Sequence, residues 1–180
     1  MAMEFTRREF IKGIGAVTVA VSVSGMLAGC GDDKVAEGSG LNWPQTQNNV
    51  TMTIQEIKYT VGQDAGQSYL YFYPKVKIES SNALPISVQP QKSFLMKLDG
   101  KTELICDDNA KNMASVYGIQ VLSDKTLKGG ESVSGYIYGR VLGQNKWNKL
   151  NTCYYLNVDD TRYKITINVY KNDMSLVSSK

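Results

Sequence analysis

The chain has 180 residues, of which 42% are hydrophobic and 21% are charged, and its formal net charge is +3. Length and composition predict one globular domain and argue against a largely disordered or polytopic membrane protein. The sequence contains no histidine, which excludes a Ser-His-Asp triad, an imidazole base and a His-ligated metal site. The small, scattered net charge argues against a nucleic-acid-binding protein.

The N-terminal segment has the organisation of an export signal. Residues 6–12 read TRREFIK, and a weakly apolar stretch follows at 13–26. That stretch is too short and too polar to span a bilayer, which needs about 20 apolar residues, and it fits the central region of a secretion signal. The segment 6–12 resembles the twin-arginine signal Ser/Thr-Arg-Arg-x-Phe-Leu-Lys, with Ile11 in place of leucine. The resemblance implies export of a folded chain, with Arg7 and Arg8 as the recognised pair.

A short motif, Leu27-Ala28-Gly29-Cys30, ends the apolar stretch. It resembles a bacterial lipobox, in which a diacylglycerol is attached to the cysteine thiol and the signal is cleaved just before it. The resemblance implies that the signal peptide 1–29 is removed and that the mature chain begins at a lipidated Cys30. Two acyl chains anchor a protein stably, so the expected location is the outer face of the cytoplasmic membrane, in the cell envelope. The alternative is a buried cysteine at the end of an apolar segment.

The next segment, 30–49, is rich in Gly, Asp, Asn and Gln and has no apolar period. This composition predicts a flexible lipidated tether. Trp43-Pro44 is the exception, and it is expected to dock on the domain or to sit at the lipid surface. From Val50 onward the hydrophobic period becomes two, which is typical of half-buried strands. The domain is therefore expected at 50–170, followed by a C-terminal tail at 171–180 that frays.

Seven to nine short strands separated by turns are expected in the domain. The alternating or apolar runs lie at 50–54, 70–78, 94–98, 101–106, 119–122, 133–141, 154–158 and 163–169. Asp99-Gly100 is a strong two-residue hairpin signal, and Pro74 predicts an edge or a bulge in its strand. Residues 108–117 are expected to form one helical turn at most. This pattern predicts an all-β protein, either a sandwich or a barrel.

Three segments of the domain resemble the telokin-like immunoglobulin sandwich: the strand end at 78–82, the hairpin at 98–101, and the sequence LKGGESVSG at 127–135. The resemblance covers roughly residues 50–170. It implies an immunoglobulin-like antiparallel β-sandwich of the kind found in small secreted proteins and lipoproteins of unknown function. The chain departs from the family pattern at 139–142, where Gly-Arg-Val-Leu replaces an aromatic residue plus proline. The resemblance implies a fold and a location, and no reaction.

Two cysteines, Cys106 and Cys153, remain as an even pair if Cys30 carries the lipid. Both are expected at strand ends, so a disulfide between them is one interpretation. Two buried thiols are the second, because a domain that folds before export folds in a reducing compartment. A redox-active pair is the third, although neither residue belongs to a Cys-x-x-Cys motif.

Tyrosine is the conspicuous residue type, with 11 copies. Alternation places Tyr69, Tyr71 and Tyr73 on one strand face and Tyr136 and Tyr138 on another, each row beside basic residues. Exposed rows of rigid amphipathic rings suit a binding surface for a glycan, a polymer chain or a protein. Their basic neighbours would suit an acidic wall polymer. The alternative is that these rings only cover the flank of the sandwich.

Two further features have both a functional and a structural interpretation. Trp147 lies in a polar loop, where it is either a recognition residue or a plug at the end of the sandwich. Asp107-Asp108 and Asp159-Asp160 are expected in turns, with a weak cation site as the alternative for the first pair. No catalytic residue, metal site or cofactor is expected.

The sequence thus predicts a membrane-anchored extracytoplasmic lipoprotein that acts as a non-catalytic binding or accessory module at the cell surface. Its expected partners are the membrane, through the lipid anchor, and an unknown surface protein or wall polymer, and the chain is expected to be a monomer. One alternative is a cofactor-carrying envelope enzyme or redox protein that is exported folded. The other is a structural spacer or surface antigen without a ligand of its own.

Overall fold

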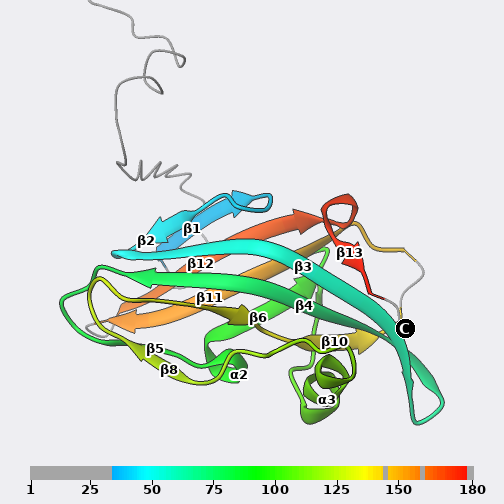
Figure 1. Ribbon diagram of the computed structural model, residues 1–180. Helices are drawn as coiled ribbons and strands as arrows, with labels where there is room; N and C mark the ends of the chain where they lie inside the picture. Colours follow the sequence, from blue (N-terminus) through cyan, green and yellow to red (C-terminus); the bar gives the residue numbers. More distant parts are fainter. Residues whose placement is uncertain (1–33, 144–145, 159–160, 178–180) are drawn as a thin grey trace, which may run out of the picture.

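A computed structural model describes residues 34–143, 146–158 and 161–177. The predicted all-β antiparallel sandwich is confirmed, because two sheets face each other as stacked layers (Figure 1). Some sequence predictions fall outside the described residues: the signal residues Arg7 and Arg8, the lipobox Leu27, Ala28, Gly29 and Cys30, and the acidic pair Asp159-Asp160.

The first sheet has five strands in the spatial order β1-β12-β11-β6-β7. Their bounds are β1 (Lys34–Ser39), β12 (Thr161–Tyr170), β11 (Lys149–Val158), β6 (Phe94–Leu98) and β7 (Thr102–Glu103). All neighbours in this sheet run antiparallel except β1 and β12, which are parallel. The sheet therefore combines strands from both ends and the middle of the chain.

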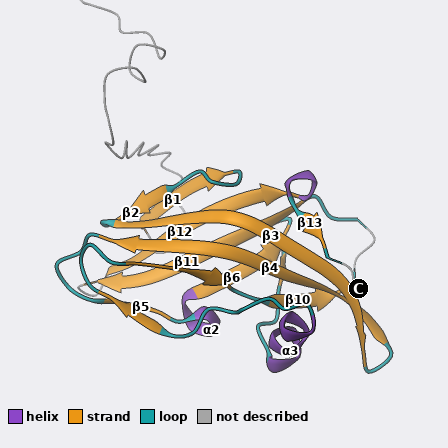
Figure 2. Cartoon of the chain, viewed as in Figure 1, coloured by secondary structure: helices purple, strands orange, loops and turns teal. Residues whose placement is uncertain are grey.

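The second sheet follows the order β10-β4-β3-β13, with β2 paired to β3 and β9 paired to β4. Its strands are β10 (Gly139–Leu142), β4 (Gln67–Ser80), β3 (Val50–Asp64), β13 (Ser175–Leu176), β2 (Gln45–Gln47) and β9 (Ser132–Tyr136). A separate ribbon pairs β5 (Ile86–Val88) with β8 (Lys125–Leu127). Figure 2 shows how little helix accompanies these strands: α2 (Pro90–Ser93), α3 (Asp108–Val116) and the 3-10 turn η1 (Lys171–Asp173).

The hydrophobic core lies between the two sheets and follows the predicted alternation. Fully buried side chains of β3 face fully buried side chains of β12: Val50, Met52 and Ile54 on one side, and Ile165, Ile167 and Val169 on the other. Burying each such side chain stabilises the fold by roughly 1.5–3 kcal/mol. The outer faces of both strands are more polar, as expected for an antiparallel sheet with one solvated face.

The hairpin predicted at Asp99-Gly100 is confirmed between β6 and β7. Both residues have positive φ, at 50° and 73°, as in a tight hairpin turn. The loop has three residues and not two, because Leu98 is opposite Thr102. The Asp99 carboxylate also accepts hydrogen bonds from the backbone N–H groups of Asn148 and Lys149, each at 3.0 Å. This single turn residue therefore fixes the start of β11 as well as the hairpin.

The edge position suggested by Pro74 is wrong, because β4 is a central strand with β3 on one side and β9 and β10 on the other. Pro74 lies where the partner of β4 changes from β10 to β9, and Ile137 N–H donates to its carbonyl at 2.9 Å. The ladder is interrupted at this point, so the missing N–H of proline costs no strand hydrogen bond. On the other side of β4, the register of β3 shifts between Ile54 and Glu56.

The flexible tether predicted at 30–49 is wrong for residues 34–49. Lys34–Ser39 form β1, which pairs with β12, and the following β2 pairs with β3. Figure 1 shows β1 and β2 side by side, where they close one edge between the two sheets. Edge strands are held by backbone pairing more than by apolar side chains. A polar edge strand therefore lacks the hydrophobic alternation from which a strand is predicted. The asparagines of this segment serve turns, because Asn42, Asn48 and Asn49 have positive φ.

The frayed tail predicted at 171–180 is wrong for its first residues. Lys171–Asp173 form η1, and β13 pairs in parallel with Lys58 and Tyr59 at the edge of the second sheet. Lys171 N–H donates to the Asn148 carbonyl at 2.7 Å, and Val177 N–H donates to the Tyr59 carbonyl at 2.8 Å. The domain thus extends from Lys34 to at least Val177.

Candidate functional site

The tyrosine rows do lie on the outer face of the second sheet, but the prediction that they form an exposed binding surface is wrong for most of their members. Tyr71, Tyr73 and Tyr138 are buried, and they form a second small core with Ala110 and Ala114 of α3. Helix α3 covers them, where one helical turn at most was expected. The alternative interpretation, that these rings cover the flank of the sandwich, describes them better.

Helix α3 forms because a good N-cap precedes a short apolar stripe. The Asp107 carboxylate accepts the N–H of Ala110 at 2.9 Å, which satisfies one of the free donors at the start of the helix. Ala110 and Ala114 are four residues apart and therefore share the face that meets the sheet. Asp107 has a structural role here, in agreement with the turn interpretation of Asp107-Asp108.

Hydroxyl groups of the covered tyrosines are engaged inside the protein. The Tyr73 hydroxyl donates to the Ala110 carbonyl at 3.4 Å, and the Tyr138 hydroxyl accepts from Gln91 Nε2 at 2.7 Å. Burial raises the pKa of Tyr73 above its ordinary value, and it raises the pKa of Tyr138 despite the Gln91 hydrogen bond. Both hydroxyls stay protonated at neutral pH, and they bond to two different helices: Tyr73 to α3 and Tyr138 to α2.

Arg140 fastens α3 to the sheet. Its guanidinium contacts the Asp107 carboxylate at 2.7 Å and pairs with Asp64, and it stacks over the Tyr69 ring with 4.4 Å to the ring centroid. The Arg140 side chain is only 10% exposed. Burial alone would lower the pKa of Arg140, but the hydrogen bonds to Asp64 and Asp107 outweigh it and raise that pKa. The guanidinium therefore links β10, β3 and the N-cap of α3.

Tyr136 remains half-buried beyond the helix, and charged neighbours surround it. Lys58 Nζ lies 5.0 Å from its ring centroid and Lys75 Nζ lies 5.8 Å away, while its hydroxyl donates to Glu56. Burial and the Glu56 hydrogen bond raise the pKa of Tyr136. Of the predicted surface, only Tyr69 and Tyr136 reach solvent in part, and both rings are already covered by cationic side chains.

Trp147 plugs the core, which was one of the two interpretations of this residue. It is 5% exposed, and its ring meets those of Tyr59 and Phe72 edge-on, with centroids 5.4 and 5.1 Å away. Lys171 Nζ lies over the indole ring, 4.6 Å from its centroid. The exposed tryptophan of the described chain is Trp43, at 60% exposure.

The disulfide between Cys106 and Cys153 is not formed, and both residues are free thiols. They lie in separate places: Cys153 Sγ is 3.4 Å from Thr166 Oγ1 on the outer face of the first sheet, whereas Cys106 packs beside the small core under α3. Burial and then the nearby Asp107 carboxylate raise the pKa of Cys106 to about 11. A thiol with so high a pKa is inert at neutral pH. Of the three interpretations, two buried thiols is nearest to the structure, although Cys153 is buried and Cys106 only partly so.

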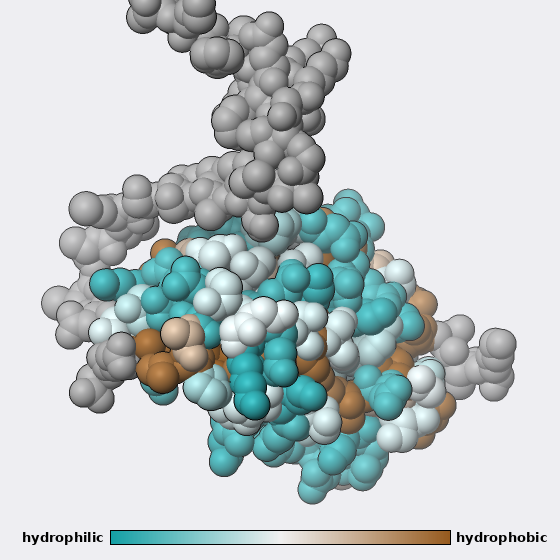
Figure 3. Space-filling view, turned by 60° about the vertical axis from the view of Figure 1, so that its left-hand side comes forward, coloured by the Kyte–Doolittle hydropathy of each residue, from teal (hydrophilic) through white to brown (hydrophobic). Residues whose placement is uncertain are grey.

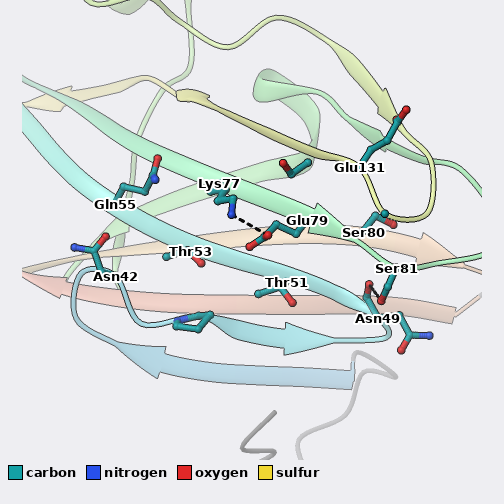
Figure 4. A pocket seen from close by; sticks show the side chains of 13 residues that line it. Asn42, Asn49, Thr51, Thr53, Gln55, Lys77, Glu79, Ser80, Ser81 and Glu131 are labelled. Atoms are coloured by element: carbon teal, nitrogen blue, oxygen red, sulfur yellow. Dashed lines mark hydrogen bonds and ion pairs between the residues drawn. The ribbon is translucent and has the colours of Figure 1, made fainter. Parts of the chain in front are cut away.

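An open groove lies on the uncovered half of the second sheet, and we call it the β3–β4 groove. It encloses about 550 Å³. Its lining residues are Asn42, Pro44, Asn49, Thr51, Thr53, Gln55, Lys77, Glu79, Ser80, Ser81, Gly130, Glu131 and Ser132. Figure 4 shows Thr51, Thr53 and Gln55 along β3 and Lys77 and Glu79 along β4, with Asn42 and Glu131 on opposite sides. Hydroxyl and amide groups dominate this lining.

The strand register arranges these groups in rows across the sheet. Thr51 is opposite Glu79, which in turn is opposite Ser132, and Thr53 is opposite Lys77. Adjacent strands are about 4.8 Å apart, so each row presents polar groups at that interval. Sequence reasoning missed this site because an outward-facing Thr or Ser on a strand is ordinary. Only the strand register shows which of these polar side chains lie opposite one another.

Interactions among the groove side chains fix their orientations. Lys77 Nζ forms an ion pair with Glu79 at 2.8 Å, which Figure 4 marks with a dashed line. Thr51 Oγ1 lies 2.7 Å from Thr46 Oγ1, and Ser134 Oγ donates to Gln55 at 2.7 Å. The one cation of the lining is therefore neutralised within the groove, and the remaining charge is that of Glu131.

Other kinds of site are not evident in the described part of the chain. No three His, Cys, Asp or Glu side chains within it gather as they would around a metal ion. Its helices are too short and too polar for any of them to cross a membrane. Figure 3 shows a face where hydrophilic and weakly polar residues predominate and hydrophobic residues form small separate areas.

Comparison with known proteins gives structural similarity only. No protein family and no curated protein matches the sequence. The fold is similar to that of the yjhA protein from Bacillus subtilis, with a TM-score of 0.46 and 12% identity over 72% of this chain and 98% of that one. It is also similar to an uncharacterized beta-sandwich protein from Clostridium difficile 630, with a TM-score of 0.39 and 7% identity over 77% of this chain and 99% of that one.

Proposed function

We propose that this chain is an exported, lipid-anchored, non-catalytic binding module whose ligand-binding surface is the β3–β4 groove. The observation that carries the binding role is the groove itself, where polar groups from β3, β4, β9 and the adjoining loops face one open space. The Lys77–Glu79 ion pair and the hydrogen bonds of Thr51 and Gln55 to neighbouring side chains orient these groups before a ligand arrives, which lowers the entropic cost of binding. The export and the anchor rest on TRREFIK at 6–12 and on Leu27-Ala28-Gly29-Cys30.

The proposed lipid anchor would lie close to the domain in the chain. Strand β1 begins at Lys34, so four residue steps separate it from Cys30. Each step spans at most about 3.6 Å, which places the first strand within roughly 14 Å of the lipid headgroups. The β1–β2 edge and the adjoining groove would then lie close to the membrane, not at the end of a long flexible tether.

Replacing Cys30 with alanine should release the protein from the membrane fraction, because no acyl chain can then be attached. The wild-type chain should stay in that fraction through a high-salt wash and leave it only with detergent. The paired substitution Arg7→Lys and Arg8→Lys should instead retain the precursor inside the cell, since a twin-arginine signal needs both guanidinium groups. Fractionation with immunoblotting measures the wild type and both variants. A membrane-bound Cys30→Ala protein would contradict the lipid anchor, and normal export of the lysine variant would contradict the twin-arginine route.

The binding role is tested by sedimentation with isolated cell envelopes. The purified chain carries Cys30→Ala in every case, so that no acyl chain binds the membrane by itself. The double variant Thr51→Val and Thr53→Val removes two groove hydroxyls while keeping the side-chain shape and the β-branching that strands favour. We expect it to reduce the bound fraction severalfold. Thr126→Val is the matched control, because Thr126 is exposed on β8 and lies outside the groove. Equal sedimentation of all three proteins, or of none, would favour a spacer without a ligand.

A further inference from the structure

We infer that the β3–β4 groove takes an uncharged, hydroxyl-rich ligand, namely a neutral glycan chain. The inference rests on the proposed function, because it names the ligand of the same groove. It starts from the chemistry of the lining, where hydroxyl, amide and backbone groups outnumber charged groups. Such groups both donate and accept hydrogen bonds, as the hydroxyls of a sugar do.

The charge of the groove argues against an anionic ligand. Lys77 is the one cation among the lining residues, and its ammonium is paired with Glu79 at 2.8 Å. Glu131 adds a carboxylate at the rim and accepts the N–H of Lys128 at 2.9 Å. An acidic polymer entering here would meet net negative charge and would have to separate the Lys77–Glu79 pair. Three basic residues suggested an acidic wall polymer, and each has a partner within the protein. Lys77 lies in this groove and is paired with Glu79, Lys75 packs on Tyr136, and Arg140 is bound by Asp64 and Asp107.

The shape of the groove favours a chain over a compact molecule. It is open to solvent and runs across several strands, from Asn42 in the β1–β2 turn to Glu131 and Ser132 at the start of β9. Rows of polar groups repeat at the strand spacing of about 4.8 Å. A linear oligosaccharide presents its own hydroxyls in a repeating series, so successive sugar units can meet successive rows.

An exposed aromatic residue lies in the sequence between two residues that line the groove. Trp43 is 60% exposed, and its neighbours in sequence, Asn42 and Pro44, both line the groove. Aromatic faces pack against the apolar C–H faces of sugars, and Trp provides the largest such face. Because Trp147 is enclosed in the core, Trp43 also supplies a fluorescence signal that a ligand in the groove can change.

The test is calorimetric titration of the full chain, in a detergent without a sugar headgroup, with three oligosaccharides. Cellotetraose and chitotetraose are the neutral probes, and tetragalacturonate is the anionic probe of similar length. We expect at least one neutral probe to bind with a dissociation constant between about 0.1 and 1 mM, since the floor has no aromatic ring to stack on. Tetragalacturonate should bind at least tenfold more weakly. Tryptophan fluorescence should change with the neutral probe in the wild type and not in Trp43→Phe.

Variants of the groove distinguish a wrong ligand class from a wrong binding site. Thr51→Val with Thr53→Val should weaken binding of the neutral probe roughly tenfold, because two hydrogen-bonding hydroxyls are lost, whereas Thr126→Val should leave it unchanged. Stronger binding of tetragalacturonate, or binding of neither neutral probe, would overturn the glycan assignment. If envelopes are still bound through the groove in that case, the proposed function stands. If the threonine variant binds envelopes and probes like the wild type, the groove is the wrong site and both proposals fail.

Discussion

Replacing Trp147 with alanine is expected to lower the free energy of unfolding by about 3–5 kcal/mol, the range found when a large buried aromatic side chain is removed. The indole is 5% exposed and meets the rings of Tyr59 and Phe72 edge-on at 5.4 and 5.1 Å. Those two rings come from the paired strands β3 and β4, so the cavity would open inside the sandwich. The substitution would also remove the indole ring on which Lys171 packs. Thermal unfolding followed by circular dichroism should show a midpoint lower by roughly 10 °C.

Trp43→Ala is the matched control for this experiment. It removes the same side chain from a position that is 60% exposed, so the free energy of unfolding should change by less than about 0.5 kcal/mol. Each variant keeps one of the two tryptophans, so their fluorescence spectra can be compared. The buried indole of Trp147 should emit at shorter wavelength than the exposed indole of Trp43. A similar loss of stability in both variants, or a larger loss in Trp43→Ala, would contradict the assignment of Trp147 as the core plug.

The strands of the domain could be predicted because their burial follows a simple period. Val50, Met52 and Ile54 alternate with polar residues in the sequence, and all three are fully buried in the sandwich. Asp99-Gly100 could be predicted as a hairpin because few residue pairs adopt positive φ twice in succession. In both cases the local sequence contains the whole physical cause, so no distant contact is needed to recognise it.

The edge strands could not be predicted in the same way. Strand β1 is held by its backbone pairing with β12, whose residues lie more than a hundred positions later in the chain. Its sequence, KVAEGS, has no apolar face and looks like a linker. The same holds for β13, where Ser175 and Leu176 pair with Lys58 and Tyr59. Long-range backbone hydrogen bonds leave no periodic signal in the sequence.

The tyrosine face shows a different limit. Alternation correctly places Tyr71 and Tyr73 on the outer face of their strand, but it cannot say what covers that face. The cover is α3, whose apolar stripe consists mainly of Ala110 and Ala114. Two alanines form a weak hydrophobic pattern, and such a pattern predicts one helical turn at most. The β3–β4 groove was missed for the complementary reason, because Thr51 and Thr53 matter only through their register with Glu79 and Lys77.

Removing the charge of Arg140 should detach α3 from the sheet and lower the free energy of unfolding by about 2–4 kcal/mol. The substitution Arg140→Met keeps much of the side-chain length but leaves the Asp64 and Asp107 carboxylates facing each other without a cation. Breaking a buried ion pair by removing one partner typically costs about 3–5 kcal/mol. The expected cost is smaller here because the two carboxylates are 36% and 32% exposed and keep part of their hydration.

The pH dependence of this effect follows from the raised pKa of Arg140. A raised pKa in the folded state means that the stabilisation is complete below the ordinary arginine pKa and is lost only above it. The difference in stability between the wild type and Arg140→Met should therefore stay constant between about pH 6 and 9, because arginine is charged throughout that range. Urea unfolding at both ends of the range measures it. A difference that disappears by pH 9 would contradict the guanidinium as its source.

Tyr69→Leu is the control that isolates the carboxylates from the ring contact. It removes the ring over which Arg140 stacks at 4.4 Å from the centroid and leaves Asp64 and Asp107 in place. An exposed cation–π contact contributes about 0.5–1 kcal/mol, so the Tyr69 variant should lose less stability than Arg140→Met. Trypsin gives a local readout, because the exposed Lys111 lies in α3 and the bond after it can be cleaved only when the helix unfolds locally. Cleavage after Lys111 should be much faster in Arg140→Met and nearly unchanged in Tyr69→Leu. Equal cleavage in both would show that packing of Ala110 and Ala114 alone holds the helix, without the arginine clamp.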